Sequence, residues 1–321
     1  MDVGHDKPVG SPERPGRGPT RARPTAGSPP PHVGPPLVIA HRGASAARPE
    51  HTLAAYQVAL DTGADGLECD VRLTRDGHLV CVHDRTVDRT SNGRGVVSDF
   101  DLDRLERLDF GSWHERWPAS ADELLGDEPY LAGVAPDVDA RGRVLRLDAL
   151  LELVTASARP VRMFVETKHP TRYAGLVEKE LVRSLRRFNL VRADGHRAVT
   201  DAGEPMVTVM SFAPTALRRV RLLAPTVPTV LLLERLKPSR RAGDLPTGTS
   251  AAGPGLRVVR AHPEFVARVH DRGRLVYVWT VDDPVDIAFV LTLGVDAVIT
   301  NDPATALRVR ADPGANYRNQ V

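Results

Sequence analysis

The sequence has few cysteines and no extended apolar run. Of its 321 residues only Cys69 and Cys81 are cysteines, and each lies in an apolar, strand-like run where a thiol packs as a small hydrophobic group. A disulfide framework is therefore not indicated. No apolar run approaches the ~20 residues that a membrane-spanning helix needs, and the N-terminus lacks the apolar core of a secretory signal. We therefore expect a soluble, cytoplasmic protein without a stable membrane anchor.

Acidic and basic residues nearly cancel. The chain holds 43 Lys and Arg against 41 Asp and Glu, which gives a formal net charge of +2. Residues 1–36 contribute five basic and three acidic residues, which is the whole excess. The remainder is balanced and gives no support to the basic surface that nucleic-acid binding requires. We expect a small-molecule substrate and no nucleic-acid partner.

Residues 1–36 also differ from the rest in composition. They contain ten prolines and six glycines and almost no aliphatic side chains, so they cannot bury enough surface to offset the entropy of ordering. We predict a disordered tail there and a flexible C-terminal tail at 312–321. The intervening residues 37–311 are long enough for a substantial core, either as one large barrel or as two ordinary domains.

Short apolar runs of β type alternate with amphipathic stretches of helical period in this region. The predicted strands are 37–40, 66–73, 79–82, 161–166, 206–211, 229–233, 257–260, 275–279 and 296–300. The predicted helices are 51–62, 101–108, 146–157, 172–188, 214–223, 263–271, 284–292 and 303–310. Such repeated alternation favours a (β/α)8 TIM barrel. An insertion around 111–145 and a loop at 235–255 do not fit the repeat, and each is either a lid or a solvated surface segment.

One predicted strand, GLECDV, carries two acids. Side chains at i and i+2 of a strand share a face, so Glu68 and Asp70 point together while Leu67, Cys69 and Val71 point the other way. Two ionised carboxylates this close raise each other's pKa unless a cation neutralises them. Hard divalent cations take oxygen ligands. The pair therefore suggests a metal site, although an isolated E-x-D is more often a solvated strand end.

Other strand ends supply the context that this pair needs. His41 and Arg42 follow the first strand, His83 follows the run at 79–82, and Glu166 and Lys168 end another strand. The carboxyl ends of barrel strands are where active sites assemble. Acids that hold a divalent cation, with basic side chains beside them, suit a phosphate, and two histidines can serve as general acid and base. The set indicates phosphoester cleavage.

The order of these motifs resembles the glycerophosphodiester phosphodiesterase family over residues 37 to 310. The motifs are HRG at 41–43, PEHT at 49–52, LECDV at 67–71, VHD at 82–84, FVETK at 164–168 and YVWTVDD at 277–283. The resemblance implies a barrel hydrolase that uses a divalent cation to convert glycerophosphodiesters to sn-glycerol 3-phosphate and an alcohol. By position it implies metal ligands at Glu68, Asp70 and Glu166, and an acid–base pair formed by His41 and His83.

The resemblance also implies the roles of several surrounding residues. Arg42 and Lys168 would contact the phosphate, and Trp279 would lie against the glycerol moiety, although a tryptophan of the barrel core is equally consistent with the sequence. We expect Glu50 to organise the pocket from behind the ligands. The family's Pro-Glu-Asn-Thr has His51 in place of its asparagine here, and we expect that departure to touch none of the proposed ligands.

Some questions stay open at this stage. Ligand type suits Ca²⁺, Mg²⁺ and Mn²⁺ alike, either histidine can be the acid, and the attacker is either water or the substrate's own 2-hydroxyl. Asp84 follows His83, but we favour a turn or cap role for it. The alternatives are a phospholipase of type C or D acting on intact lipid, for which no membrane-binding surface is evident, and a non-catalytic phosphate-binding barrel. The alcohol and the oligomeric state are not readable.

Overall fold

The computed structural model describes Met1 and residues 34–114 and 142–312, except 193, 195, 197, 201 and 202. Nearly all of the predicted N-terminal tail, most of the insertion and residues 313–321 of the predicted C-terminal tail lie outside the described residues. The predictions for those segments therefore stay predictions.

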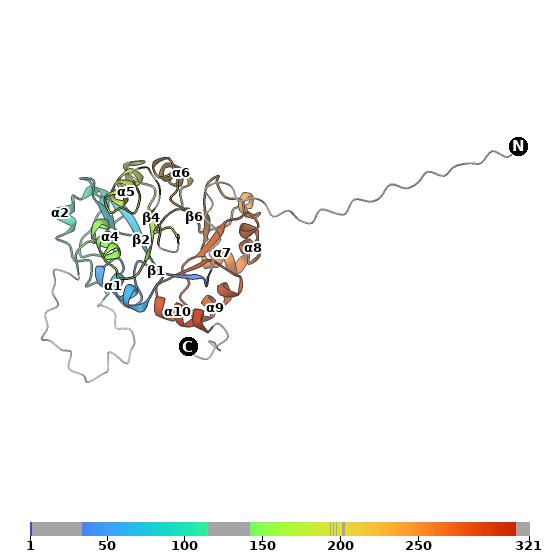
Figure 1. The fold of residues 1–321 in the computed structure, drawn as a ribbon. Coiled ribbons are helices and arrows are strands. Elements are labelled where there is room, and N and C mark those ends of the chain that lie inside the picture. The colour runs from blue at the N-terminus through green and yellow to red at the C-terminus, as the bar shows by residue number, and fades with distance from the viewer. Residues whose placement is uncertain are drawn as a thin grey trace, which may run out of the picture.

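Strands of the described residues form one closed sheet (Figure 1). Eight described strands run parallel in the barrel wall: β1 (Leu37–His41), β2 (Gly66–Leu73), β4 (Arg162–Thr167), β5 (Val207–Ser211), β6 (Thr229–Leu233), β7 (Ala251–Pro254), β8 (Leu275–Val278) and β9 (Ala297–Thr300). Each pairs with the next, and pairing of β1 with both β2 and β9 closes the ring. The predicted (β/α)8 barrel is confirmed.

Helices surround this barrel on the outside (Figure 1). The principal described helices are α1 (Leu53–Thr62), α4 (Leu147–Thr155), α5 (Leu176–Arg187), α6 (Pro214–Leu223), α7 (Leu256–Ala261), α8 (Glu264–His270), α9 (Pro284–Thr292) and α10 (Pro303–Ala311), with the short α2 (Leu102–Leu105) and the 3-10 turns η1 (Val97–Asp99) and η3 (Pro238–Arg240). Thr52 caps α1 by accepting a hydrogen bond from the Ala55 N–H. In the described part of the chain, no helix has the length and hydropathy needed to span a bilayer.

Two predicted strands differ from the structure. Residues 257–260, predicted as a strand, belong to helix α7, and the barrel strand is β7, just before it. A four-residue run with two valines is compatible with either a strand or a helix. The strand β7 lies within the predicted loop, and its small residues gave no β-type signal in the sequence. Gly253 is needed there because a Cβ atom would lie 2.7 Å from a methyl group of Leu232.

The second difference concerns β3 (Leu79–Cys81), which is outside the parallel wall. It runs antiparallel to β2, with Cys81 opposite Val71 and Leu79 opposite Leu73. The sequence suggested that His83 follows a parallel barrel strand. His83 instead follows this antiparallel strand. The ribbon is short, and the Val82 N–H donates to the carbonyl of Asp70, so the chain returns beside the acidic end of β2.

Alternation along β2 and β4 separates an apolar core from a charged one. Cys69 and Val165 face outward, into the cluster that packs the sheet against the helices. Phe164 faces the barrel interior, where its ring meets Tyr277 from the opposite strand edge to face, with ring centroids 5.8 Å apart. Two residues further along the same inward face of β4 comes Glu166. The interior is thus apolar near its middle and acidic at its carboxyl end.

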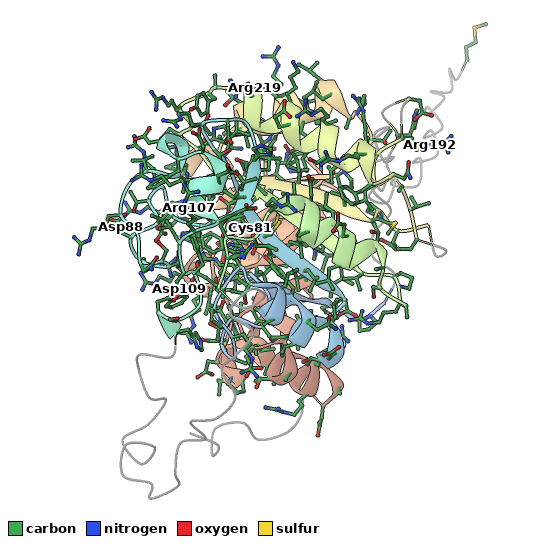
Figure 2. All side chains as sticks on the ribbon, turned by 90° about the vertical axis from the view of Figure 1, so that its left-hand side faces the viewer. Cys81, Asp88, Arg107, Asp109, Arg192 and Arg219 are labelled. Carbon is green, nitrogen blue, oxygen red and sulfur yellow. The ribbon has the colours of Figure 1, made fainter. Side chains whose placement is uncertain are left out.

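The two ends of the barrel carry different loops. Figure 2 shows Asp88, from the loop after β3, and Arg192, from the loop before β5, at opposite edges of the molecule. Because the eight wall strands run parallel, the loops that follow them gather at one end of the barrel, and Glu166 lies near that end of β4. Loops that precede the strands gather at the other end.

Candidate active site

Three carboxylates meet at the carboxyl end of the barrel. Glu68 and Asp70 of β2 and Glu166 of β4 are buried, and each offers an oxygen within 4.8 Å of the other two. Parallel pairing sets this geometry, because Asp70 and Glu166 are register partners in neighbouring strands. Glu68 and Asp70 share one face of β2, as predicted, and this face points into the barrel.

The charges in this cluster are crowded. Burial, with Asp70 next to it, raises the pKa of Glu68 well above its usual range and that of Glu166 to about 8. Burial also opposes ionisation of Asp70, but Lys168, His51 and Arg42 together hold the pKa of Asp70 well below its usual range. One further positive charge among these oxygens would allow all three carboxylates to ionise.

The donor set fits a divalent cation. All three side chains offer oxygen, which Ca²⁺, Mg²⁺ and Mn²⁺ prefer. Asp70 Oδ1 is buried and accepts no well-oriented hydrogen bond within the described residues, although Lys168 Nζ lies 3.0 Å away. Of the side chains that the structure describes, Lys168 is thus the one donor near this buried oxygen, and the lone pairs that it leaves open can bind a cation. We therefore regard the cluster as a candidate metal centre.

Two basic side chains flank the acids. Lys168 Nζ lies 2.9 Å from Glu166 Oε1 as well as 3.0 Å from Asp70. Arg42 Nε lies 3.2 Å from Asp70 Oδ2, and its Nη1 donates to Glu50 Oε1 at 3.0 Å. Arg42 adopts a left-handed backbone conformation, with φ of 59°, that directs its N–H to the carbonyl and side chain of Glu68. Both cations are thus held beside the candidate metal centre.

His41 ends β1 with a defined ring orientation. Its Nδ1 lies 2.7 Å from Asn301 Oδ1. The Asn301 amide is itself oriented, because its Nδ2 donates to Asp282 Oδ2 at 2.7 Å. Asn301 Oδ1 therefore accepts from the Nδ1–H of His41, which leaves Nε2 with its lone pair. Burial and the adjacent Arg42 lower the pKa of His41 to about 3, so the imidazole is neutral at physiological pH.

His83 has a charged partner instead of a neutral one. Its Nδ1 lies 2.7 Å from Asp84 Oδ1, and Asp84 Oδ2 accepts from Arg89 at 2.7 Å. Burial lowers the pKa of His83, against the opposing effects of Asp70 and Asp84. The preference for a plain turn or cap role of Asp84 was wrong, since its carboxylate orients His83.

Glu50 bridges two arginines of the site, Arg42 and Arg89. Its carboxylate accepts two hydrogen bonds of 2.7 Å from Arg89 and one from Arg42. Burial opposes its ionisation, but the hydrogen bonds from Arg89 and the charge of Arg42 lower the pKa of Glu50 to about 2. An unbroken series of contacts therefore runs from Asp84 through Arg89, Glu50 and Arg42 to Asp70. Glu50 thus contacts Asp70 through Arg42, and the organising role expected of it stays a prediction.

His51 contacts a proposed ligand, contrary to our expectation. Its Nε2 lies 3.0 Å from Asp70 Oδ2, and its Nδ1 lies 2.8 Å from the Tyr56 hydroxyl. The Tyr56 hydroxyl in turn donates to the carbonyl of Glu68 at 3.0 Å. His51 is buried and has a φ of 59°. The histidine that replaces the family's asparagine thus orients a carboxylate of the candidate metal centre.

Trp279 lies across the mouth from Lys168. It follows β8, which is separated from β4 by three strands in either direction around the barrel. Its Nε1 donates to the Gly253 carbonyl at 2.6 Å, and its ring meets the exposed Phe212 edge to face, with centroids 5.4 Å apart. Part of the ring packs on the barrel interior and part is accessible, so both predicted roles are compatible with its position.

The fold and this site define a class: a (β/α)8-barrel enzyme whose acidic cluster, basic side chains and two oriented imidazoles fit cleavage of a phosphoric diester. Comparison with known proteins agrees with this class. A family model described as the glycerophosphoryl diester phosphodiesterase family matches residues 41–305. The chain therefore belongs to that family.

Individual relatives cover nearly the same region. A probable glycerophosphodiester phosphodiesterase 1 of Mycobacterium tuberculosis is 45% identical over 88% of this chain and 96% of its own length. A glycerophosphodiester phosphodiesterase of Bacillus subtilis is 33% identical over 83% of this chain and 84% of its own. A phosphodiesterase from Oleispira antarctica, solved in complex with the product sn-glycerol-3-phosphate, matches with a TM-score of 0.66 and 22% identity, covering 87% and 97% of the two chains. That likeness concerns the fold.

Proposed function

We propose that this protein hydrolyses glycerophosphodiesters to sn-glycerol 3-phosphate and an alcohol. The observation that carries the proposal is the convergence of Glu68, Asp70 and Glu166 within 4.8 Å of one another, with His41 and His83 in the segments beside them. Family membership and the names of the full-length relatives support the same reaction. We further propose that the protein acts in the cytoplasm, which rests on the sequence alone.

In this proposal Glu68, Asp70 and Glu166 hold one divalent cation, Ca²⁺ or Mg²⁺. When bound, such a cation neutralises charge that develops on the phosphoryl oxygens. Arg42 and Lys168, held beside the carboxylates, bind the same phosphoryl group as fixed positive charges. Trp279, on the other side of the mouth, contacts the glycerol half of the substrate.

The partners of the two imidazoles suggest how they divide the work. His41 donates from Nδ1 to a neutral amide and presents an unprotonated Nε2, which suits a general base that takes the proton of the attacking hydroxyl. His83 binds the carboxylate of Asp84, which stabilises an imidazolium and suits a general acid that protonates the departing alkoxide. We therefore assign His41 as the base and His83 as the acid.

The proposal is tested by measuring release of sn-glycerol 3-phosphate from a panel of glycerophosphodiesters. The enzyme is stripped of metal and then assayed after Ca²⁺, Mg²⁺ or Mn²⁺ is added back, with His41→Ala as the blank. We expect turnover that chelation removes and one cation restores best. Hydrolysis that is insensitive to chelation, or equal rates for wild type and His41→Ala, would contradict the proposal.

A further inference from the structure

A pocket of about 350 Å³ adjoins the candidate metal centre. It lies between the end of β2, the turn η1 and the loop that joins β4 to α5. Lys168 belongs to both places, because it lines this pocket and its ammonium contacts Asp70 and Glu166. A phosphoryl group held at the candidate metal centre would therefore have one of its two ester substituents beside this pocket.

The lining of the pocket is strongly basic. Besides Lys168 it includes Arg72, Arg85 and Arg172, and among the described lining residues Asp99 is the one acid. Asp99 is already paired with Arg172. Lys168 is paired with Asp70 and Glu166, which lie outside the lining, so Arg72 and Arg85 are the two lining cations without an ion pair among the described residues. The pocket as a whole therefore favours an anion.

Two arginines contribute in different ways. Arg72 is fixed, because its Nε and Nη2 donate to the carbonyl of His83 at 3.1 and 2.7 Å. Arg85 is exposed, and within the described residues its guanidinium has no hydrogen bond or ion pair. Arg85 is thus available for a bound anion without giving up an internal contact.

The same pocket is poorly suited to a quaternary ammonium group such as choline. Recognition of such groups relies on the faces of several aromatic rings. Tyr173 is the one aromatic residue among the described lining residues, its hydroxyl donates to the carbonyl of Ser98 at 3.1 Å, and the Arg172 guanidinium lies 5.9 Å from its ring centroid. A cation entering here would meet other cations and no aromatic cage.

We propose that this pocket binds the alcohol half of the substrate and selects an alcohol that carries a phosphate or phosphodiester group over choline. The inference rests on the proposed function, in which Trp279 receives the glycerol half. Lys168 and Trp279 stand on opposite sides of the mouth, so a substrate with glycerol at Trp279 and phosphoryl at the acids directs its alcohol toward the basic pocket. Arg85 then acts as a specificity residue and takes no part in the bond cleavage.

The experiment compares kcat/KM for two substrates at low ionic strength. One is glycerophosphocholine, and the other is 1,3-bis(glycerophospho)glycerol, whose leaving alcohol keeps a phosphodiester. We expect wild type to favour the second substrate. Arg85→Gln should lower its kcat/KM about two- to fivefold, mainly through KM, as expected for one exposed charge, and leave glycerophosphocholine unchanged. Arg107→Gln, an exposed arginine outside the pocket lining, is the matched control and should change neither.

A preference of wild type for glycerophosphocholine, or an equal loss on both substrates in Arg85→Gln, would overturn the inference. Calorimetric titration with glycerol 2-phosphate and with choline distinguishes failure of the pocket inference from failure of the proposed function. Binding of the phosphate that weakens in Arg85→Gln, together with no hydrolysis of either diester, would uphold the pocket and refute the activity. An affinity for glycerol 2-phosphate that is the same in wild type and in Arg85→Gln would refute the pocket inference.

Discussion

The two ends of the barrel use the same kinds of charged residue for different purposes. At the amino end, Asp65 accepts from the Val38 N–H at 2.7 Å and pairs with Arg310, so its charge is met by a backbone donor and a cation. At the carboxyl end, the three carboxylates of Glu68, Asp70 and Glu166 crowd within 4.8 Å of one another and share two cations, Arg42 and Lys168. An acid that is paired with its own donor and cation stabilises the fold, whereas three carboxylates gathered together require a further cation from solution.

A second pair at the amino end repeats that arrangement. Asp296 accepts from the Val276 N–H at 2.7 Å and lies 2.9 Å from His270 Nε2. Both amino-end aspartates precede a strand, whereas the site acids lie within or at the end of one. The position of an acid along its strand therefore distinguishes acids that stabilise the barrel from acids of the candidate active site, as expected for this fold.

The largest expected effect follows from neutralising one acid of the cluster. Glu166→Gln should lower kcat/KM by about 10³-fold or more, because a ligand of the proposed cation loses its charge. The same change should leave the melting temperature of the metal-free protein equal or higher, because it relieves crowding of like charges. Steady-state rates with metal and thermal unfolding in chelator measure the two effects. A large loss of metal-free stability would contradict the comparison.

A smaller effect on activity is expected at the partner of His83. Asp84→Asn should lower kcat about 10- to 100-fold, because the imidazolium form of His83 loses its carboxylate partner. It should also move the alkaline limb of the pH–kcat profile to lower pH, since an unpaired imidazolium gives up its proton more easily. His83→Ala serves as the reference, because it should remove that limb altogether. An unchanged profile would show that Asp84 has only a structural role.

Breaking an amino-end lock should have the opposite signature. Asp65→Ala should lower the free energy of unfolding by about 1–3 kcal/mol, because the buried Val38 N–H and Arg310 both lose their acceptor. Its kcat/KM should stay at the wild-type value. Urea unfolding and steady-state kinetics test the pair of outcomes, and Asp61→Ala, an exposed acid on α1, should change neither quantity measurably. Lost activity in a folded Asp65→Ala would break the distinction between the two ends.

The smallest expected effect is a pH dependence of stability at the amino end. Hydrogen bonding to Asp296 raises the pKa of His270. A raised pKa in the folded state means that the contribution is fully present below the unfolded value of about 6.5 and is lost as pH rises through the folded value. Since the pair is partly exposed, the loss should be under about 1 kcal/mol. Urea unfolding on both sides of this range should show it in wild type and not in His270→Gln.

Much of the fold was readable because its signals are local. Apolar runs alternating with helical periods predicted the barrel, and the two-residue repeat predicted that Glu68 and Asp70 point together. β7 was missed because its Ala-Ala-Gly-Pro sequence has little β-type character, and that smallness reflects packing against Leu232 of the neighbouring strand. A constraint set by a neighbouring strand leaves no periodicity of its own.

The partners of the site residues were harder to predict for the same reason. Asn301, which orients His41, lies 260 positions further along the chain, and only closure of β1 on β9 brings the two together. His51 was expected to touch no ligand, yet its left-handed backbone turns it toward Asp70. Asp84 was the one partner with a nearby signal, since it directly follows His83 in the sequence.

The ribbon formed by β2 and β3 has a consequence for how this protein tolerates change. Loops between barrel strands and helices can vary in length because each end is anchored separately. The reversal at 74–78 is tight, because Thr74 and His78 hydrogen-bond to each other across it, and pairing of Val71 with Cys81 sets the register of the ribbon beyond it. A residue inserted within the paired part of the ribbon would shift this register and turn the side chains that follow it to the other face. Evolutionary drift in spacing should therefore be least between Asp70 and His83.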